Sequence, residues 1–330
     1  MATLVDAYKR RISYLRISIT DHCNLNCTYC NPSGQKQHLG RDEILSFEEI
    51  RRVVQAGIMA GINKVRITGG EPLLRKGMVN LCQMLGALDG LESISITTNG
   101  VFLNDFAEPL FAAGIRRINV SLDSLKAERF TKITGRNHLA DVLSGLERAE
   151  EAGLSPIKIN TVVMRRVNEA EIEDFAQLTL SKPYHVRFIE LMPTGSQSAA
   201  DHRAQFVPVE EIIRRVQKVG KLALERADSC GPARLCSLPG AVGKIGFIAP
   251  MSWHICGSCN RLRLTADGKL RLCIFSNEEV ELRAPLRSGA SLEELAALFR
   301  LAVTRKGPGK SHKETHMPRR TGRAMWAIGG

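Results

Sequence analysis

The sequence predicts an α/β fold: a partial (β/α)6 TIM-like barrel over residues 1–200 and a smaller C-terminal domain, residues 201–330, that covers its open side. Three observations support this prediction. Six strand-like segments alternate with amphipathic helical segments, the alternation stops after about residue 200, and a candidate site segment follows most of the strands. Six β-α units are too few to close an eight-stranded barrel, so an open barrel is favoured over a doubly wound sheet.

The barrel elements follow one another in a regular order. The strand-like segments are residues 14–19, 64–68, 93–97, 116–121, 157–163 and 185–191. The helical segments are residues 47–60, 77–88, 105–113, 139–152 and 169–180. The first helix has the clearest start, because Ser46 and Glu49 form a capping-box pattern. Strands separated by helices predict a parallel sheet with right-handed crossovers.

The C-terminal part has a different pattern. A helix is expected over residues 209–219, then a stretch rich in Gly, Pro and Cys, then a hairpin over residues 261–273. The pair Asp267-Gly268 predicts a two-residue type I′ turn. Residues 306–323 are expected to be irregular. The strand period of two places Arg261 and Arg263 on one face of the hairpin, where they suit an anion or a substrate ring edge, or form a solvated basic edge.

Three cysteines follow the first strand with the spacing C-x3-C-x2-C: Cys23, Cys27 and Cys30. Three thiolates on a short loop can hold three irons of a 4Fe-4S cluster and leave the fourth iron open. A structural zinc site needs a fourth ligand, and His22 is poorly placed to share an ion with the adjacent Cys23. The spacing therefore predicts an open-iron cluster.

A second set of three cysteines lies in the C-terminal part: Cys256 and Cys259, then Cys273 at the far end of the hairpin. This set is also one ligand short of a closed zinc site. A second 4Fe-4S cluster with an open iron is the preferred interpretation. A zinc ribbon completed by Cys230 and Cys236, or by His254, stays open as an alternative.

Other polar segments follow the predicted strands: residues 69–72, 97–100, 121–123 and 190–193. Because the ends of parallel strands meet on one rim, these segments and the cysteine loop predict an active site there. The net charge of +12 suits an anionic partner, either a polyphosphate or a nucleic acid. With only 5% aromatic residues, a base-stacking RNA platform is less favoured. No apolar run reaches membrane-spanning length and residues 1–13 lack a signal-peptide core, so a cytoplasmic protein without a membrane partner is expected.

The residues around Cys23, Cys27 and Cys30 resemble the radical S-adenosylmethionine (SAM) enzymes, through Asn24, Leu25, Tyr29 and Pro32. Residues 243–250, 259–268 and 323–330 narrow this resemblance to the GTP 3′,8-cyclases of molybdenum cofactor biosynthesis. The resemblance implies two 4Fe-4S clusters, SAM as the source of a 5′-deoxyadenosyl radical, and conversion of GTP to (8S)-3′,8-cyclo-7,8-dihydroguanosine 5′-triphosphate. The open iron of the second cluster would hold the guanine.

The same resemblance assigns roles to individual residues. GTP would be bound by Arg16, Arg66, Thr97, Lys158, Arg261, Leu262 and Arg263. SAM would be bound by Tyr29, Gly70, Ser121 and Met192, and the catalytic residues would be Arg261, Arg263, Gly329 and Gly330. The two terminal glycines would approach Arg261 or Arg263, since a chain without side chains can enter a narrow opening. Asn31, in place of an expected Met, and the loop over residues 33–39 depart from the family pattern.

The implied partners are GTP, a flavodoxin or ferredoxin as electron donor, and cyclic pyranopterin monophosphate synthase downstream; a homodimer is one candidate assembly. Two alternatives stay open. One is another radical SAM enzyme with an auxiliary cluster that modifies tRNA or a peptide. The other is a non-catalytic zinc-ribbon protein that binds nucleic acid. Of the remaining cysteines, Cys82 lies between Leu81 and Leu85 and is expected to be buried packing.

Overall fold

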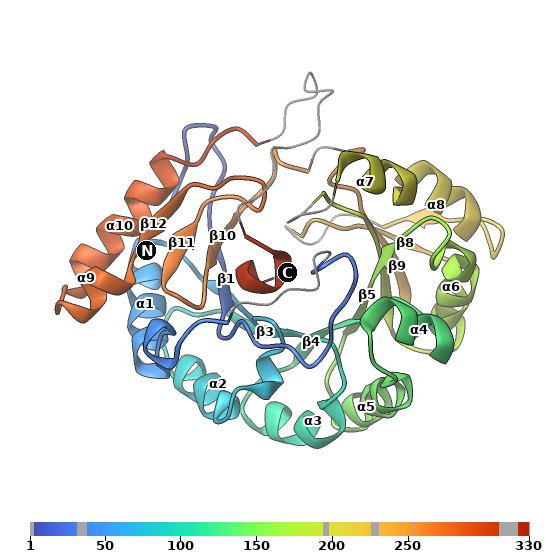
Figure 1. The fold of residues 1–330 in the computed structure, drawn as a ribbon, viewed down its shortest axis with the longest axis horizontal. Coiled ribbons are helices and arrows are strands. Elements are labelled where there is room, and N and C mark those ends of the chain that lie inside the picture. The colour runs from blue at the N-terminus through green and yellow to red at the C-terminus, as the bar shows by residue number, and fades with distance from the viewer. Residues whose placement is uncertain are drawn as a thin grey trace.

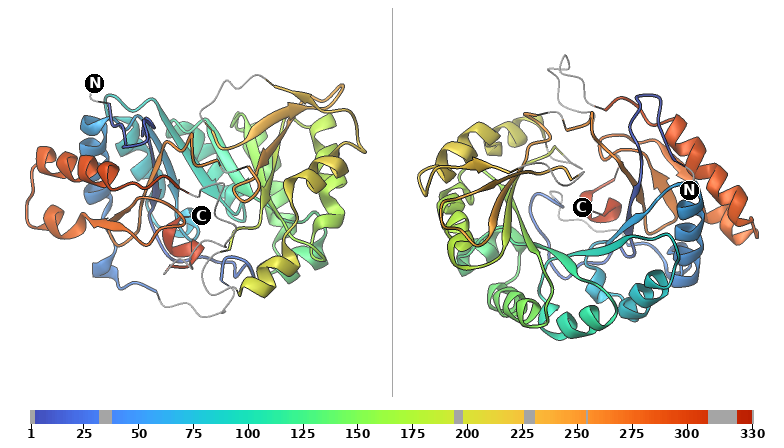
Figure 2. Two further views of the ribbon diagram at one scale, coloured as in Figure 1. Left: turned by 90° about the horizontal axis from the view of Figure 1, so that it is seen from above. Right: turned by 180° about the vertical axis from the view of Figure 1, so that it is seen from behind.

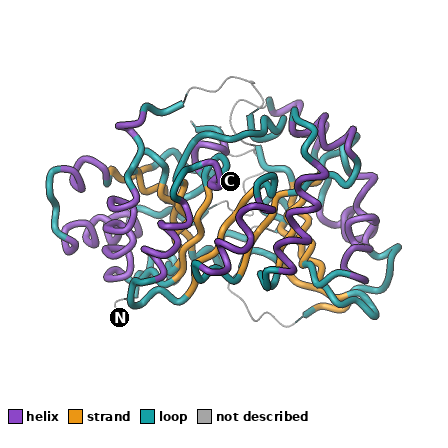
Figure 3. The backbone as a smooth tube through the Cα atoms, turned by 90° about the horizontal axis from the view of Figure 1, so that it is seen from below, coloured by secondary structure: helices purple, strands orange, loops and turns teal. Residues whose placement is uncertain are grey.

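The computed structural model describes residues 3–31, 38–193, 198–225, 231–253, 255–309 and 323–329. Its strands form one sheet in the order β12-β11-β10-β1-β2-β3-β4-β5-β6-β9-β8-β7. The sheet curves into an arc with most helices on its outer side (Figure 1). Figure 2 and Figure 3 show the same arrangement from other sides, with the strands inside and the helices around them.

The predicted (β/α)6 order is confirmed. The strands β1 (Tyr14–Ser18), β2 (Lys64–Thr68), β3 (Ser93–Thr98), β4 (Arg117–Ser121), β5 (Ile157–Val163) and β6 (His185–Glu190) are parallel neighbours in chain order. The helices between them are α1 (Phe47–Ala60), α2 (Met78–Gly86), α3 (Leu103–Ala112), α5 (Leu139–Glu151) and α6 (Ile172–Ser181). Ser46 and Glu49 make both bonds of the predicted capping box at the start of α1. Helix α4 (Ala127–Thr134) and the 3-10 helices η1 (Arg41–Glu43) and η2 (Pro72–Leu74) were not predicted. The helical segment predicted over residues 169–180 begins with the 3-10 helix η3 (Glu169–Glu171).

The C-terminal part extends the same sheet at both edges. Strand β9 (Lys244–Ile248) pairs parallel to β6, and β10 (Arg261–Leu264) pairs parallel to β1. Antiparallel strands follow outside them: β8 (Arg234–Ser237) and β7 (Ala223–Leu224) at one edge, β11 (Lys269–Arg271) and β12 (Glu279–Glu281) at the other. Eight neighbouring strands are therefore parallel. The two ends of the sheet are not paired with each other among the described strands, so the barrel is open.

The remaining helices are α7 (Ala199–Gln205), α8 (Val209–Val216), α9 (Arg283–Arg287), α10 (Leu292–Thr304) and α11 (Met325–Ile328). Helix α10 was not predicted, although Ser291 and Glu294 cap its start; it packs against α1. Helix α11 lies inside the arc of strands, near its centre (Figure 1, Figure 2).

The predicted two-residue turn at Asp267-Gly268 is wrong. Thr265 still pairs with Lys269, since its N–H donates to the Lys269 carbonyl at 2.9 Å, so the loop is residues 266–268. Gly268 alone has a positive φ, of 80°, and a three-residue loop needs only one such residue. Asp267 instead binds Arg323 through both carboxylate oxygens, at 3.0 and 2.9 Å. The predicted alternation on β10 is confirmed, because Leu262 and Leu264 are fully buried on the face opposite the arginines.

One hydrophobic core runs through both parts of the chain; Ile17, Leu262 and Phe299 belong to the same cluster of buried side chains. Cys82 is fully buried in this core, as expected, and Cys236 on β8 is buried there too. Among the described segments, no helix combines the length and apolar character needed to cross a membrane. Cys230, His254, Gly330 and residues 33–37 of the atypical loop, with most of the 306–323 tail, lie outside the described residues.

Candidate active site

The loop after β1 carries Cys23, Cys27 and Cys30, here called the N-terminal triad. Its backbone is fixed against the C-terminal end of α4, because the Asn26 N–H donates to the Thr134 carbonyl at 2.8 Å and the Thr28 N–H donates to the Ile133 carbonyl at 3.0 Å. The Leu25 N–H points to the Cys23 sulfur at 3.4 Å, and Leu25 itself is buried. Backbone donors aimed at sulfur are typical of thiolates that hold a cluster.

The segment that follows β2 packs against the start of this loop and is hydrogen-bonded to it. The Gly70 N–H donates to the Thr20 carbonyl and the Glu71 N–H to the His22 carbonyl, both at 2.7 Å. A Cβ at Gly70 would lie 2.2 Å from the His22 carbonyl oxygen, so only glycine fits there. The buried Glu71 carboxylate accepts from the Thr98 hydroxyl at 2.8 Å and the Asn99 N–H at 2.7 Å, which joins the ends of β2 and β3.

Tyr29 is held by a second buried carboxyl group. Its hydroxyl donates to Asp123, after β4, at 2.7 Å, and the Val162 N–H of β5 donates to the other Asp123 oxygen at 2.8 Å. Burial raises the pKa of Asp123 to about 6 and, by the same cause, the pKa of Glu71 to about 7. The polar supports of the N-terminal triad are therefore buried acids.

Cys256, Cys259 and Cys273, the C-terminal triad, are held by cations instead. Lys306 is buried, and its Nζ donates to the carbonyl of Arg261 at 3.1 Å and to the carbonyl of Leu272. Arg261 lies two residues after Cys259, and Leu272 directly precedes Cys273. Lys306 therefore ties together the two ends of the hairpin that carry these cysteines. Burial raises the pKa of the Cys259 thiol, but the charges of Arg261 and Lys306 and hydrogen bonds with Arg261 lower it to about 7.

Arg10 completes this support from the N-terminal segment. It is paired with the buried Asp6 at 2.5 Å, and its guanidinium donates to the carbonyls of Cys256 and Pro308 at 3.0 Å and of Gly307 at 2.5 Å. The segment after α10 is therefore connected to the hairpin directly, through Lys306, and to Cys256 through Arg10.

The inner face of the barrel carries a wall of cations. Because strand residues alternate, the inner side chains come into register: Arg16 of β1 lies beside Arg263 of β10 and Arg66 of β2, and Asn160 of β5 lies beside Arg187 of β6. None of the ion pairs between described residues involves Arg66, Arg187, Arg261 or Arg263. Like charges that are buried or half-buried, and that have no carboxylate partner in the described part of the chain, suit the binding of an anion.

The cations lower one another's pKa values. Burial is the main cause for Arg187 and Arg263, whose pKa values fall to about 10, and it also lowers the pKa of Arg16 and Arg66. Burial and then the charges of Arg187, Arg66 and Arg117 lower the pKa of Lys158 to about 7. An anion bound here would relieve this repulsion.

Both triads and the cation wall surround one cavity of about 280 Å³. The predicted site residues that line it are Arg16, Cys23, Cys27, Tyr29, Cys30, Arg66, Gly70, Thr97, Ser121, Met192, Cys256, Cys259, Arg261, Arg263 and Cys273. The structure thus brings together residues that are up to about 257 positions apart in the chain.

Three predicted residues do not line this cavity with their side chains. Leu262 points into the hydrophobic core, since it is fully buried on the other face of β10. Lys158 lies beside the cavity, on the same face of β5 as Asn160 but nearer the start of the strand. Gly329 contacts the cavity wall: its carbonyl oxygen accepts from Arg263, as does the Ile328 carbonyl at 3.3 Å. The expected approach of Gly329 to Arg263 is therefore confirmed, while Gly330 lies outside the described residues.

Three further residues line the cavity but were not predicted from the sequence: Arg187, Asn160 and Lys306. The sequence contained a sign of Arg187, because it is a charged residue in the middle of an apolar strand. It lies on the same face of the strand as Ile189, which also lines the cavity. Nothing in the local sequence indicated Lys306, because its role depends on the carbonyl groups of Arg261 and Leu272, which are distant in the chain.

The spacing of the thiols tests whether a cluster fits. A single tetrahedral zinc would hold its sulfur ligands about 3.8 Å apart, given bonds of about 2.3 Å. Among the described His, Cys, Asp and Glu side chains, the group whose ligand atoms all lie within 4.8 Å of one another is Asp21, His22 and His38, and neither triad meets that limit. A spacing beyond that limit does not suit one shared zinc ion, whereas three thiolates in each triad are ligands for three irons of a 4Fe-4S cluster. Cys236 is not among the residues that line the cavity.

Comparisons with known proteins agree with this site. Residues 17–179 match the radical SAM superfamily, and residues 184–312 match the family described as Molybdenum Cofactor Synthesis C. The chain is 47% identical to the GTP 3′,8-cyclase of Moorella thermoacetica, over 98% of this chain and 99% of that protein. It is also 47% identical to the GTP 3′,8-cyclase of Thermodesulfovibrio yellowstonii, over the same shares of the two chains.

Among solved structures, the chain is similar in fold to Streptococcus suis SuiB bound to S-adenosylmethionine. The TM-score is 0.61 with 13% sequence identity, over 89% of this chain and 69% of that one. At this identity the likeness concerns the fold alone, and it agrees with a partial barrel.

Proposed function

The chain belongs to the GTP 3′,8-cyclase family of radical SAM enzymes, and we propose that its cavity converts GTP to (8S)-3′,8-cyclo-7,8-dihydroguanosine 5′-triphosphate. This is the first step of molybdenum cofactor biosynthesis. The observation that carries the proposal is one cavity lined by both cysteine triads and by buried cations. When bound, the two 4Fe-4S clusters and SAM supply electrons, a 5′-deoxyadenosyl radical and an open iron for the guanine.

On the N-terminal side, the cysteines Cys23, Cys27 and Cys30 would hold the SAM cluster. Tyr29, Gly70, Ser121 and Met192 would bind SAM. The Asp123 carboxyl group keeps the Tyr29 ring in place by a hydrogen bond of 2.7 Å, and the glycine at position 70 lets the cluster loop pack directly on the next strand. These residues orient the cofactor; their own charges take no part in the reaction.

On the other side, Cys256, Cys259 and Cys273 would hold the auxiliary cluster. The cations Arg16, Arg66, Arg261 and Arg263 would bind GTP, with Lys158 and Arg187 beside them. A triphosphate brings several negative charges to a site where burial and mutual repulsion lower the pKa values of the cations, so binding would raise those pKa values. Thr97, whose buried hydroxyl has no hydrogen-bond partner among the described residues, offers a further donor in the same cavity.

The C-terminal tail would position the substrate. Gly329 has φ of 70°, and a Cβ there would lie 2.6 Å from the Cγ2 methyl of Thr68. The Arg263 guanidinium holds the Gly329 and Ile328 carbonyls, so the tail and the substrate would share this side chain. With Arg261, Arg263 and Gly329 in these places, the tail and the two arginines would turn the ribose toward the radical.

The reaction also needs electrons from outside. A flavodoxin or ferredoxin would supply two of them per turnover, one for SAM cleavage and one, with a proton, for the cyclised radical. A cyclic pyranopterin monophosphate synthase would take the product. A homodimer stays a prediction.

An anaerobic assay of the reconstituted enzyme tests this function. GTP deuterated at C3′ is incubated with SAM and a reductant, and the products are analysed by mass spectrometry. We expect one deuterium in 5′-deoxyadenosine for each cyclic nucleotide formed. Deuterium-free 5′-deoxyadenosine together with unchanged GTP, under conditions in which a bulk tRNA pool is modified, would reassign the substrate to tRNA.

A further inference from the structure

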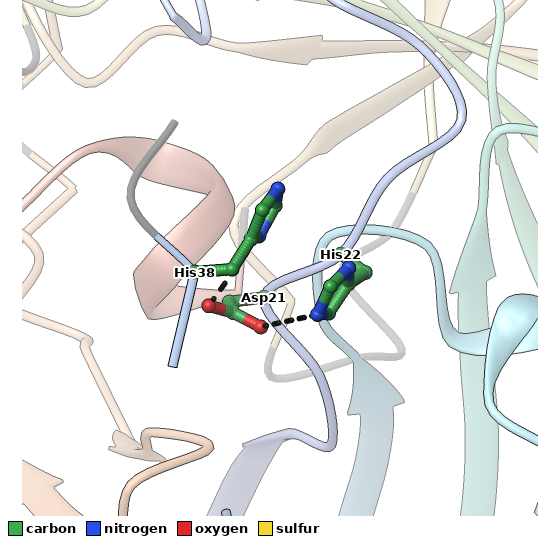
Figure 4. A group of neighbouring side chains, drawn as sticks. All are labelled: Asp21, His22 and His38. Atoms are coloured by element: carbon green, nitrogen blue, oxygen red, sulfur yellow. Dashed lines mark ion pairs between the residues drawn. The ribbon is translucent and has the colours of Figure 1, made fainter. Parts of the chain in front are cut away.

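A group of metal-ligand side chains lies outside the cavity, at the neck of the loop that carries the N-terminal triad. Asp21 and His22 precede Cys23, and His38 lies on the returning segment (Figure 4). One ligand atom from each of these residues lies within 4.8 Å of the other two. None of the three lines the cavity between the triads, so the group is separate from the proposed GTP and SAM sites.

Among the described residues, only one oxygen of the buried Asp21 carboxylate has a hydrogen-bond donor. The carboxylate is 1% exposed, and its Oδ2 accepts from the Leu39 N–H at 2.7 Å. Its Oδ1 is buried and has no hydrogen-bond partner among the described residues. A buried carboxylate oxygen without a donor is costly, and a cation placed against it would remove that cost.

The two imidazoles face this carboxylate at distances that suit a shared ion. His22 Nε2 lies 3.7 Å from Asp21 Oδ1, and His38 Nδ1 lies 3.6 Å from Asp21 Oδ2. Both distances are too long for hydrogen bonds. Two ligands of one tetrahedral ion with bonds of about 2.1 Å lie about 3.4 Å apart, which is close to both separations. Because the two rings are stacked, one of them must rotate for both nitrogens to reach the same ion.

The backbone at His22 is held by hydrogen bonds, while its side chain can adjust. The His22 N–H donates to the Thr20 hydroxyl at 3.1 Å, and the His22 carbonyl accepts from the Glu71 N–H at 2.7 Å. The His22 side chain is 54% exposed and stacks on His38 with ring centroids 4.0 Å apart, so rotation of the exposed ring can turn its nitrogen toward the ion. A fixed backbone with an adjustable exposed ligand favours capture of an ion from solvent.

We propose that Asp21, His22 and His38 bind one divalent transition-metal ion of the zinc class, with solvent completing its coordination. Two imidazoles and one carboxylate are ligands for Zn²⁺ and its neighbours in the first transition row, whereas Mg²⁺ and Ca²⁺ prefer oxygen. The ion joins both ends of the segment that contains Cys23, Cys27 and Cys30. A metal bridge that closes this loop restricts its open conformations and so protects the triad.

The test uses the anaerobic enzyme with both clusters assembled and Zn²⁺ as the probe. After equilibrium dialysis against micromolar Zn²⁺, zinc and iron are measured by mass spectrometry. We expect one zinc per chain at unchanged iron content, and an X-ray absorption spectrum at the zinc edge with nitrogen and oxygen ligands only. Hydrogen exchange of the loop that carries the N-terminal triad should slow when zinc is added.

His38→Ala removes one ligand from an exposed position and should weaken zinc binding about tenfold or more. His138→Ala is the matched control, because His138 also faces a carboxylate, Asp141 at 2.7 Å, but has no third ligand among the described residues. It should bind zinc as the parent does. Equal zinc retention by His38→Ala and the parent, or sulfur ligands in the spectrum, would overturn the proposal. Zinc binding does not depend on GTP turnover, so its failure would leave the proposed function unaffected.

Discussion

The two cysteine triads share one cavity but differ in their electrostatic surroundings. Buried acids support the N-terminal triad, where burial raises the pKa of Glu71 to about 7 and the pKa of Asp123 to about 6. Cations surround the C-terminal triad, where burial raises the pKa of the Cys259 thiol but the charges of Arg261 and Lys306 lower it to about 7. The acidic side suits a ligand with a net positive charge, such as SAM with its sulfonium and ammonium groups, and the basic side suits a polyanion such as GTP.

The largest expected effect separates the triads directly. Replacing Cys23, Cys27 and Cys30 by Ala should remove about half of the roughly eight irons and abolish SAM cleavage. Replacing Cys256, Cys259 and Cys273 by Ala should remove the other half, abolish the cyclic nucleotide and leave SAM cleavage measurable. Iron analysis and 5′-deoxyadenosine formation check both variants. Loss of SAM cleavage in both would mean that the triads are not separable.

The C-terminal tail links the two sides of the cavity, and the second prediction concerns its Gly329. Gly329→Ala places a methyl group 2.6 Å from Thr68 and strains a residue with φ of 70°, so the tail should leave Arg263. Cyclic product should fall strongly, while both clusters and most GTP binding remain. Deleting Gly329 and Gly330 should have the same result. Parent-level product from either variant would mean that the tail is a frayed end.

Removing one cation tests the basic side alone. Lys158→Ala should weaken GTP binding by roughly 1.5–3 kcal/mol, about ten to a hundredfold, and leave SAM binding unchanged. Isothermal titration with each ligand measures this difference. Lys132→Ala, which removes an exposed lysine of α4, is the control and should bind GTP as the parent does. If the two lysine variants bind GTP equally well, Lys158 is not part of the site.

The lowered pKa of Lys158 predicts a smaller effect of pH. Burial and the neighbouring Arg187, Arg66 and Arg117 bring its pKa to about 7, and a bound triphosphate would raise it. Binding above pH 7 must therefore take up a proton, so GTP affinity should fall between pH 7 and pH 8.5, by at most about tenfold per unit. Lys158→Arg keeps its charge and should flatten this dependence. The same slope in both proteins would rule out Lys158 as its source.

The smallest effect concerns the cations that hold the C-terminal triad. Lys306→Met removes a positive charge and two donors to the carbonyls of Arg261 and Leu272. The auxiliary cluster should keep less iron, and its reduction potential should become more negative because the reduced form loses a cation. Redox titration followed by electron paramagnetic resonance measures the shift. Lys269→Met on β11 is the control, and an equal shift in that variant would point to general charge effects.

Local patterns in the sequence determined much of this protein. The spacing of Cys23, Cys27 and Cys30 is a property of one short loop, and the capping of α1 depends on four consecutive residues. The strand period of two is enough to place Arg261 and Arg263 on one face of the hairpin, and both side chains line the cavity. These features could be predicted because their causes lie within a few residues of chain.

Only the tertiary structure decided how the distant parts meet. The pairing of β10 with β1 puts Arg263 beside Arg16, and the pairing of β9 with β6 joins the C-terminal part to the same sheet at its other side. Arg10 reaches the Cys256 carbonyl across 246 positions of chain, and His38 returns to Asp21 past the whole cluster loop. Such contacts depend on which long loops close and on how the helices pack outside the sheet. Since loop closure costs entropy that packing elsewhere offsets, no short segment of sequence carries the information.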